Sequence, residues 1–165
     1  MRYSTLSLVM LTALLAACSS SDTGANTGAG GAGSGAGAGG YAAGQAVPGS
    51  EEDLVQTVGD RVFFATDRST LDDAARTTLD RQSAWLQRFP TVNVMIAGNC
   101  DERGTEEYNL ALGQRRATAD ADYLAAHGIS ASRLQVISYG KNRPTDPGSS
   151  PEAWAKNRNA ITAVR

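Results

Sequence analysis

Residues 97–117, AGNCDERGTEEYNLALGQRRA, contain the end of a strand, a charged turn and the beginning of a helix. The run that leads into them, VNVMIA at 92–97, alternates and is rich in β-branched residues, which predicts a half-buried strand that Gly98 ends. Residues 99–104 form the turn, and Thr105 is typical of a helix N-cap. Backbone N–H groups at a helix start attract carboxylates, so we expect a site of this kind at the junction.

Two charged residues sharpen this expectation. Asp101 lies in the turn, and Arg116 lies about three helical turns into the predicted helix. Their charges can serve one site only if the turn folds back beside the helix. A surface ion pair worth under about 1 kcal/mol is an equally good interpretation of the spacing.

The rest of the chain predicts alternating strands and helices, with about 110 residues available for one domain. Long helices between strands favour parallel pairing through crossovers, and the last strand makes the pairing mixed. We therefore predict an α+β fold with two layers, in which a mixed four-stranded sheet carries its helices on one face. The other predicted strands are 61–65, 134–139 and 160–164, and the predicted helices are 70–89, 105–127 and 151–156.

The helix that begins near Thr70 has a capping-box-like start with Asp73, and Pro90 ends it. One face collects its apolar residues, with a glutamine as the weak member: Leu71, Ala75, Leu79, Gln82, Leu86 and Phe89. Residues 51–59 before the first strand are expected to be a short acidic lead-in.

The N-terminal part predicts a lipid anchor and a tether. Residues 1–17 have one positive charge, an apolar run too short to span a bilayer and small residues before Cys18, as in a lipoprotein signal peptide. We expect Cys18 to be the lipid attachment site, and Ser19 after it implies, by analogy with bacterial lipoproteins, transfer to the outer membrane. Residues 18–50 are mostly Gly, Ala and Ser and predict a flexible tether, which leaves 51–165 as the domain.

Composition argues against two classes of function. The net charge of -2 and the pI of about 5.3 give no electrostatic basis for binding nucleic acid. A catalytic thiol would need a base, but the only histidine, His127, is expected at the far end of the helix that follows Cys100. Cys100 is expected to be a shielded, unpaired thiol.

A family resemblance rests on residues 98–105, GNCDERGT, continued by 107–109, 112–113 and 115–117. With later stretches at 136–141 and 156–158, this pattern closely resembles the peptidoglycan-associated lipoprotein branch of the OmpA C-terminal-like family, over about residues 62–164. The resemblance implies an OmpA-like βαβαβ arrangement with an added strand. It also implies a protein that binds peptidoglycan without cutting it, with no catalytic residue, metal or cofactor.

The usual ligand of this family is the meso-diaminopimelate of the stem peptide, whose terminal carbon bears an ammonium and a carboxylate. Asp101 and Arg116 match the family positions for these two charges and are expected to line an open groove outside the core. Further positions that match the groove are Asp67, Arg103, Asn109 and Leu112, although Asn109 can instead hold the turn in place by hydrogen bonds.

The resemblance further implies a lipid-anchored protein of the outer membrane whose domain faces the periplasm of a Gram-negative bacterium. Its partners are expected to be peptidoglycan and the Tol proteins of the Tol-Pal system, in particular the periplasmic TolB, with a role in envelope integrity and constriction at division. The alternative is a wall hydrolase, an amidase or glycosidase with Asp101 and Glu102 as acid and base. Adjacent carboxylates in a turn rarely face one bond from opposite sides, as glycosidic hydrolysis needs.

The chain departs from the family pattern at several positions. Asn99 and Cys100 stand where most relatives have His and Ala, and Asn159 replaces a common arginine with no role that the sequence assigns. Asp120 occupies a usually apolar helix position four residues after Arg116, so it either braces that guanidinium or reaches solvent. Ala65 and Thr66 replace a polar and an aromatic residue, which affects ligand packing on that side.

Overall fold

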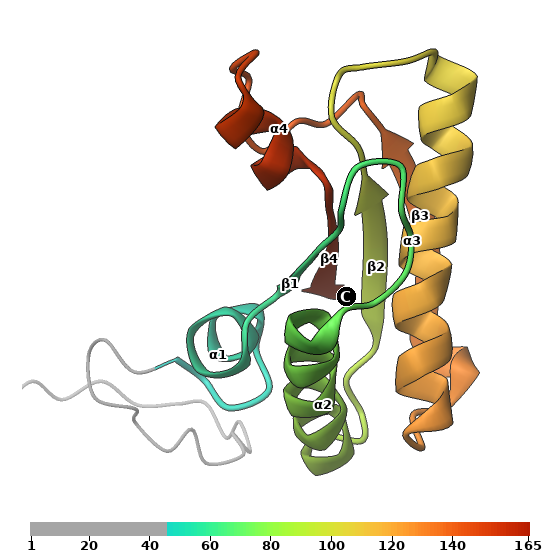
Figure 1. Ribbon diagram of the computed structural model, residues 1–165. Helices are drawn as coiled ribbons and strands as arrows, with labels where there is room; N and C mark the ends of the chain where they lie inside the picture. Colours follow the sequence, from blue (N-terminus) through green and yellow to red (C-terminus); the bar gives the residue numbers. More distant parts are fainter. Residues whose placement is uncertain (1–45) are drawn as a thin grey trace, which may run out of the picture. The chain divides into compact units, whose positions relative to one another are not determined.

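The computed structural model describes residues 46–165, and the predicted signal peptide, Cys18 and most of the predicted tether lie outside this range. Figure 1 shows the order of the elements along the chain. They are α1 (Glu51–Asp53), continued by a π-helical turn (Leu54–Val58), β1 (Arg61–Phe63), α2 (Asp73–Arg88), β2 (Val94–Asn99), α3 (Glu106–Ala126), a 3-10 turn (Ala131–Arg133), β3 (Leu134–Gly140), α4 (Pro151–Asn157) and β4 (Asn159–Val164).

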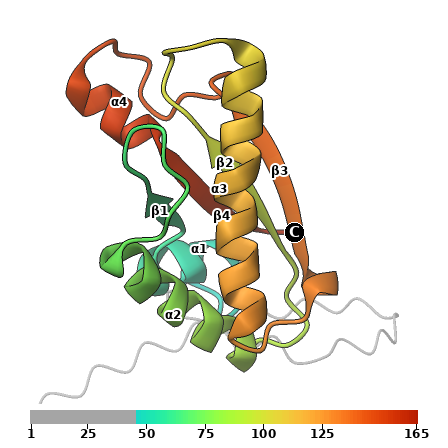
Figure 2. The ribbon, with the colours of Figure 1, turned by 45° about the vertical axis from the view of Figure 1, so that its right-hand side comes forward.

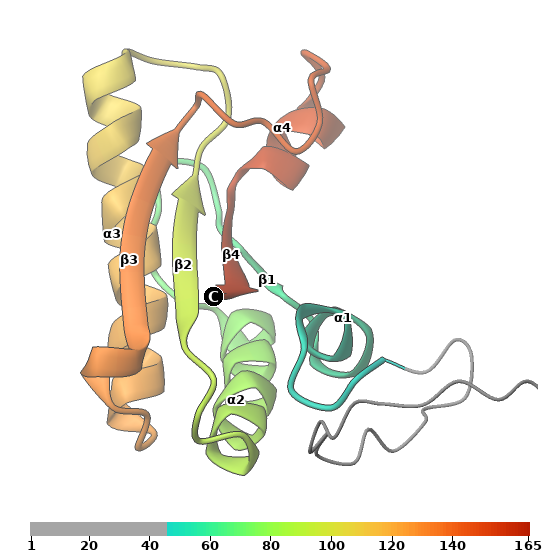
Figure 3. The same cartoon turned by 180° about the vertical axis from the view of Figure 1, so that it is seen from behind.

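The four strands form one mixed sheet in the order β1-β4-β2-β3. β2 runs parallel to β3, whereas β4 runs antiparallel to both β1 and β2. In the central register, Ala97 of β2 pairs with Ile137 on one side and with Ile161 on the other. α2 and α3 pack on one face of the sheet, which the opposite views of Figures 1 and 3 both show. The predicted α+β fold is therefore confirmed.

α2 confirms the predicted apolar face but not the predicted cap. Asp72, not Thr70, is the N-cap, and its Oδ1 accepts from the backbone N–H of Ala75 at 2.8 Å. The buried face includes Gln82, whose side chain is fully buried and has a hydrogen-bond partner for each end of its amide. Its Nε2 donates to the carbonyl of Gly59 and its Oε1 accepts from Thr162 of β4.

α3 lies along the sheet between its predicted boundaries (Figure 2). Thr105 is the N-cap, accepting from the N–H of Tyr108, and Gly128 follows the last turn with a left-handed φ of 90°. The prediction that Gly98 ends β2 is wrong, because the strand continues to Asn99. Gly98 instead allows close packing, since a Cβ there would overlap the carbonyl oxygen of Gly113 in α3.

The acidic lead-in is helical, which the sequence analysis did not predict. Ser50 caps α1, and Leu54 in the next turn is fully buried in the core. The indole of Trp85 in α2 donates to Asp53 at 2.9 Å, which attaches this segment to the domain. Among residues 46–165 no helix combines the length and apolar character needed to cross a bilayer.

Candidate functional site

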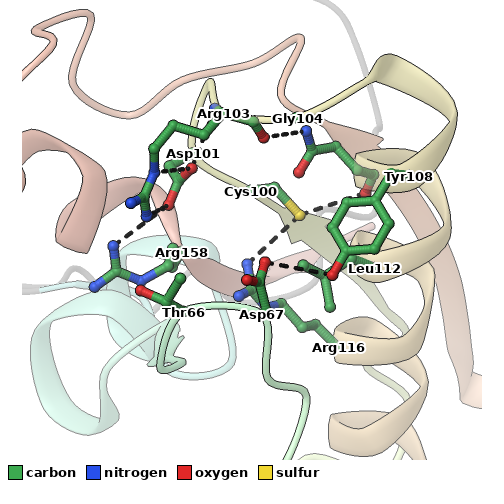
Figure 4. Close-up of a pocket in the computed structure, with 11 residues that line it drawn as sticks. Thr66, Asp67, Cys100, Asp101, Arg103, Gly104, Tyr108, Leu112, Arg116 and Arg158 are labelled. Carbon is green, nitrogen blue, oxygen red and sulfur yellow. Dashed lines mark hydrogen bonds and ion pairs between the residues drawn. The ribbon is translucent and has the colours of Figure 1, made fainter.

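A hollow of about 290 Å³ lies between the loop after β1, the turn after β2 and the N-terminal half of α3 (Figure 4). All six residues predicted from the family resemblance lie in its wall, so the turn does fold back beside the helix. The lining consists of Asp67, Asp101, Arg103, Asn109, Leu112 and Arg116, together with Thr66, Cys100, Gly104, Tyr108 and Arg158.

Asp101 is 7% exposed and is surrounded by donors. Arg103 binds it with both arms of the guanidinium, Nε to Oδ1 at 3.0 Å and Nη2 to Oδ2 at 2.7 Å, and the backbone N–H of Arg103 adds a third bond. Nη1 of Arg158 lies 3.4 Å from Oδ2 on the other side. Burial by itself would raise the pKa of Asp101, but the bonds from Arg103 and Arg158 outweigh it and hold the pKa below its usual range. Asp101 is therefore a carboxylate.

Arg116 lines the hollow but is fully buried, so the expectation that it lies outside the core is wrong. Its Nε donates to the carbonyl of Arg68 at 2.9 Å, Nη2 to that of Ala65 at 3.1 Å, and Nη1 to that of Asn99 at 2.7 Å. Burial lowers the pKa of Arg116, yet an arginine remains charged. The guanidinium joins the loop after β1 to the end of β2, so its role is structural whatever else it binds.

Cys100 is buried, as predicted, with Sγ 3.4 Å from the carbonyl of Asn109 and 3.5 Å from Nη1 of Arg116. Burial raises the pKa of this thiol even though Arg116 is adjacent. His127 caps the opposite end of α3, beside Tyr123, so it is not placed to act as a base for Cys100.

Asn109 has the structural role that was left open. Its Nδ2 donates to the carbonyls of Arg103 at 2.8 Å and Thr105 at 3.0 Å, which fixes the end of the turn against α3. On the facing loop, Asp67 is exposed with a left-handed φ of 54° and accepts from the hydroxyl of Tyr108 at 3.3 Å.

Arg158 and Tyr108 are wall residues that the sequence analysis did not assign. Both belong to stretches that carry the family resemblance, 156–158 and 107–109, so the signal was present without a role attached to it. Arg158 reaches the hollow because it follows α4 and donates from Nε to the carbonyl of Phe64 at 3.1 Å.

Two departures from the family pattern contact each other behind the hollow. Nδ2 of Asn99 donates to Oδ1 of Asn159 at 2.8 Å, and Asn159 donates in turn to Thr145 and to the carbonyl of Lys156. The backbone carbonyl of Asn99 is also an acceptor of Arg116, so this amide pair supports the guanidinium.

Asp120 follows neither of the two predicted alternatives. It does not brace Arg116, because the bonds of that guanidinium go to backbone carbonyls and to Cys100, and it does not reach solvent, because it is fully buried. In the part of the chain that the structure describes, neither carboxyl oxygen has a hydrogen-bond partner. Burial raises the pKa of Asp120 to about 8.

The electrostatics of the hollow suit binding of a ligand with both charges. Three guanidinium groups and two carboxylates line it, which leaves an excess of one positive charge. The pKa of Glu102, next to Asp101, is also lowered, by hydrogen bonds from Trp154 and Ser149. Among the described residues no group of three or more metal-ligating side chains is assembled.

Comparison with known proteins places the chain. Residues 63–158 match the model of the OmpA family. The peptidoglycan-associated lipoprotein of Agrobacterium fabrum is 48% identical over 119 residues, covering 72% of this chain and 67% of the relative. The crystal structure of the peptidoglycan-associated lipoprotein from Burkholderia pseudomallei superposes with a TM-score of 0.64 at 33% identity, over 68% of this chain and 100% of that one.

The C-terminal domain of Helicobacter pylori MotB shares the fold, with a TM-score of 0.60 at 21% identity over 64% of this chain and 84% of that one. The family match spans more than half of the chain and includes the strand, turn and helix that build the hollow. The chain therefore belongs to the OmpA family, in its peptidoglycan-associated lipoprotein branch.

Proposed function

We propose that this chain binds peptidoglycan without cutting it, and that the hollow receives the diaminopimelate end of the stem peptide. The names of the relatives support the class of ligand. The observation that carries the proposal is one hollow in which a carboxylate and several guanidinium groups lie within reach of a single ligand terminus. A terminus with an ammonium and a carboxylate needs this combination.

The contacts suggest how the two ligand charges divide. Asp101 is the acceptor for the ligand ammonium, because its carboxylate is charged and lines the hollow between Arg103 and Arg158 (Figure 4). The ligand carboxylate binds Arg158, which uses only Nε and one Nη1 bond within the domain and so retains further N–H donors. Arg116 also lines the hollow, but it is fully buried and its donors are bonded mainly to the protein, so it contributes its positive charge from behind the wall.

The hydrolase alternative has less support from the chemistry of these carboxyls. A general acid needs a raised pKa to hold its proton at neutral pH. The pKa values of Asp101 and Glu102 are both lowered. Asp120 has the raised pKa, but it is buried in the core and does not line the hollow.

We also propose that Cys18 carries the lipid and that the chain tethers the outer membrane to the wall from the periplasmic side, as a member of the Tol-Pal system with TolB as a partner. The support is the cysteine after an apolar leader in the sequence and the lipoprotein names of the relatives. Labelled palmitate that still enters a Cys18→Ser chain would contradict the anchor.

The test of wall binding is co-sedimentation of the full-length chain with purified sacculi. We expect the chain to bind diaminopimelate-type wall and to bind lysine-type wall more weakly. Lysine lacks the terminal carboxylate, so the arginine donors of the hollow lose their acceptor. Asp101→Asn should weaken binding by about thirtyfold or more, as expected when one member of a desolvated charge pair is lost.

The matched control is Asp73→Asn, which removes an exposed carboxylate at the start of α2 and should leave binding unchanged. Equal sedimentation with both wall types, or equal binding by folded Asp101→Asn, would place the site elsewhere. Release of soluble fragments from the sacculi would favour the hydrolase.

A further inference from the structure

Trp154 in α4 contacts both residues that follow Asp101 in the turn. Its Nε1 donates to Oε1 of Glu102 at 2.9 Å. The guanidinium carbon of Arg103 lies 4.4 Å from the centroid of the indole. Trp154 lies outside the wall of the hollow, yet it holds the two residues that follow Asp101, the proposed acceptor of the ligand ammonium.

The indole matters because Arg103 would otherwise be poorly fixed. The side chain of Arg103 is 43% exposed, and an ion pair this open to water has little energy to hold a long side chain in one rotamer. A guanidinium on an indole face is attracted by the ring and confined to one plane. That confinement keeps Arg103 in the two-armed contact with Asp101, which has fixed directions for both oxygens.

Trp154 is itself held by the loop and helix around it. Asn157, in the last turn of α4, exchanges two hydrogen bonds with the backbone of Asp146, at 2.8 and 2.7 Å. Ser149, just before the helix, donates to the second carboxylate oxygen of Glu102 at 3.0 Å. The residue after α4 is Arg158, which contacts Asp101 directly, so the same short helix acts on Asp101 from two directions.

We propose that Trp154 is a positioning residue for wall binding: through Glu102 and Arg103 it sets the direction and the charge surroundings of the Asp101 carboxylate. The inference rests on the proposed function of the hollow. It assigns a role to an aromatic residue 53 positions away from Asp101 in sequence that does not itself line the site.

The experiment compares Trp154→Ala and Trp154→Phe in the full-length chain by two measurements. The first is the pKa of Asp101, from the carboxyl carbon shift in a pH titration without wall, and the second is co-sedimentation with diaminopimelate-type sacculi. Trp154→Ala should release Arg103, move the pKa of Asp101 upward toward its ordinary value and weaken binding about fivefold to tenfold. Trp154→Phe keeps a ring under Arg103 but loses the bond to Glu102, so both effects should be smaller.

Trp85→Phe is the matched control, because it removes an indole bond of the same kind, to Asp53 at 2.9 Å, far from the turn. It should change neither the pKa of Asp101 nor binding. An unmoved pKa of Asp101 in folded Trp154→Ala would overturn the proposal even if binding falls, since Trp154 would then act by another route. Trp154→Phe makes the same comparison if the Ala variant does not fold.

The two measurements also separate this role from the proposed function. Wild-type protein that fails to sediment with any sacculi would remove the proposed function, and the positioning role with it. Wild-type protein that binds, with Trp154 variants that bind equally well, would remove only the role of Trp154.

Discussion

Two buried carboxyl groups, one at the hollow and one further along α3, have opposite surroundings and opposite pKa shifts. Asp101, at the hollow, is 7% exposed and has two guanidinium groups and a backbone N–H around it. Asp120, further along α3, is fully buried, and no partner for its oxygens is present within residues 46–165. The pKa of Asp101 is lowered, and that of Asp120 is raised to about 8. The fold therefore keeps a charge where a ligand can meet it and a neutral acid in the core.

Arg116 lies between these two regions and shows why they differ. It stands four residues before Asp120, a spacing that brings side chains together on a helix surface. Its donors nevertheless point to the carbonyls of the loop after β1 and of the end of β2. The guanidinium of Arg116 binds three carbonyls from two segments rather than the carboxyl of Asp120, because Asp120 would have to be ionised in the core to bind it.

The largest expected effect comes from removing Arg116. Arg116→Ala leaves three backbone carbonyls without their donor and opens a cavity, so we expect a loss of about 3–5 kcal/mol in the free energy of unfolding. Urea denaturation measures it. Arg115→Ala is the control, since Arg115 is exposed on the same helix and should change stability by under about 0.5 kcal/mol. Equal stability of the two variants would mean that the carbonyl contacts do not hold the hollow together.

Local patterns predicted the elements of the fold well, because their causes are local. Thr105 and Gly128 mark α3 by cap chemistry, and alternation marks the strands. The misses depend on contacts between distant segments. Gly98 remains in β2 because α3 packs against it, and the lead-in becomes helical where Leu54 enters the core.

The site divides in the same way. The six residues taken from the resemblance, including Asp101 and Asn109, line one hollow, because motif positions carry over without knowledge of distances. It could not show that Arg116 points into backbone carbonyls, since a helical spacing gives the neighbours of a residue but not the direction of its side chain. Nor could it pair Asn99 with Asn159, which are 60 positions apart and meet only across the sheet.

The second effect in size concerns Asp120 and depends on pH. The pKa of Asp120 is about 8 in the folded protein, against an ordinary value of 3.8. Between these two pH values the folded state holds a proton that the unfolded chain has lost. The stability contribution is therefore fully present below about pH 4, falls as the pH rises toward 8 and is flat above. Asp120→Asn removes this titration and should raise the free energy of unfolding at pH 8 by on the order of 2–4 kcal/mol.

Urea curves between pH 4 and pH 9 measure this difference, which should vanish near pH 4. The control is Asp122→Asn, two residues along, which removes an exposed carboxyl from the same helix and should change stability by under about 0.5 kcal/mol. A wild-type stability that does not decline between pH 4 and 8 relative to Asp120→Asn would show that the carboxyl finds water or a partner, and the contrast with Asp101 would fail.

The smallest expected effect concerns the hydrogen bond between Asn99 and Asn159, and it tests whether this pair is part of the polar network around Arg116. Asn99 and Asn159 are both buried, and the bond between them is 2.8 Å long. Asn99→Ala, Asn159→Ala and the double variant form a cycle whose coupling energy should be about 1 kcal/mol, because each single change leaves the other amide short of a partner. In a second cycle, Asn142→Ala takes the place of Asn159→Ala. Asn142 is exposed and bonds Glu106 instead, so the stability changes of this cycle should be additive within about 0.5 kcal/mol. If the Asn99 and Asn159 changes are also additive, the pair is independent, and Arg116 keeps its acceptor at Asn99 through the strand backbone alone.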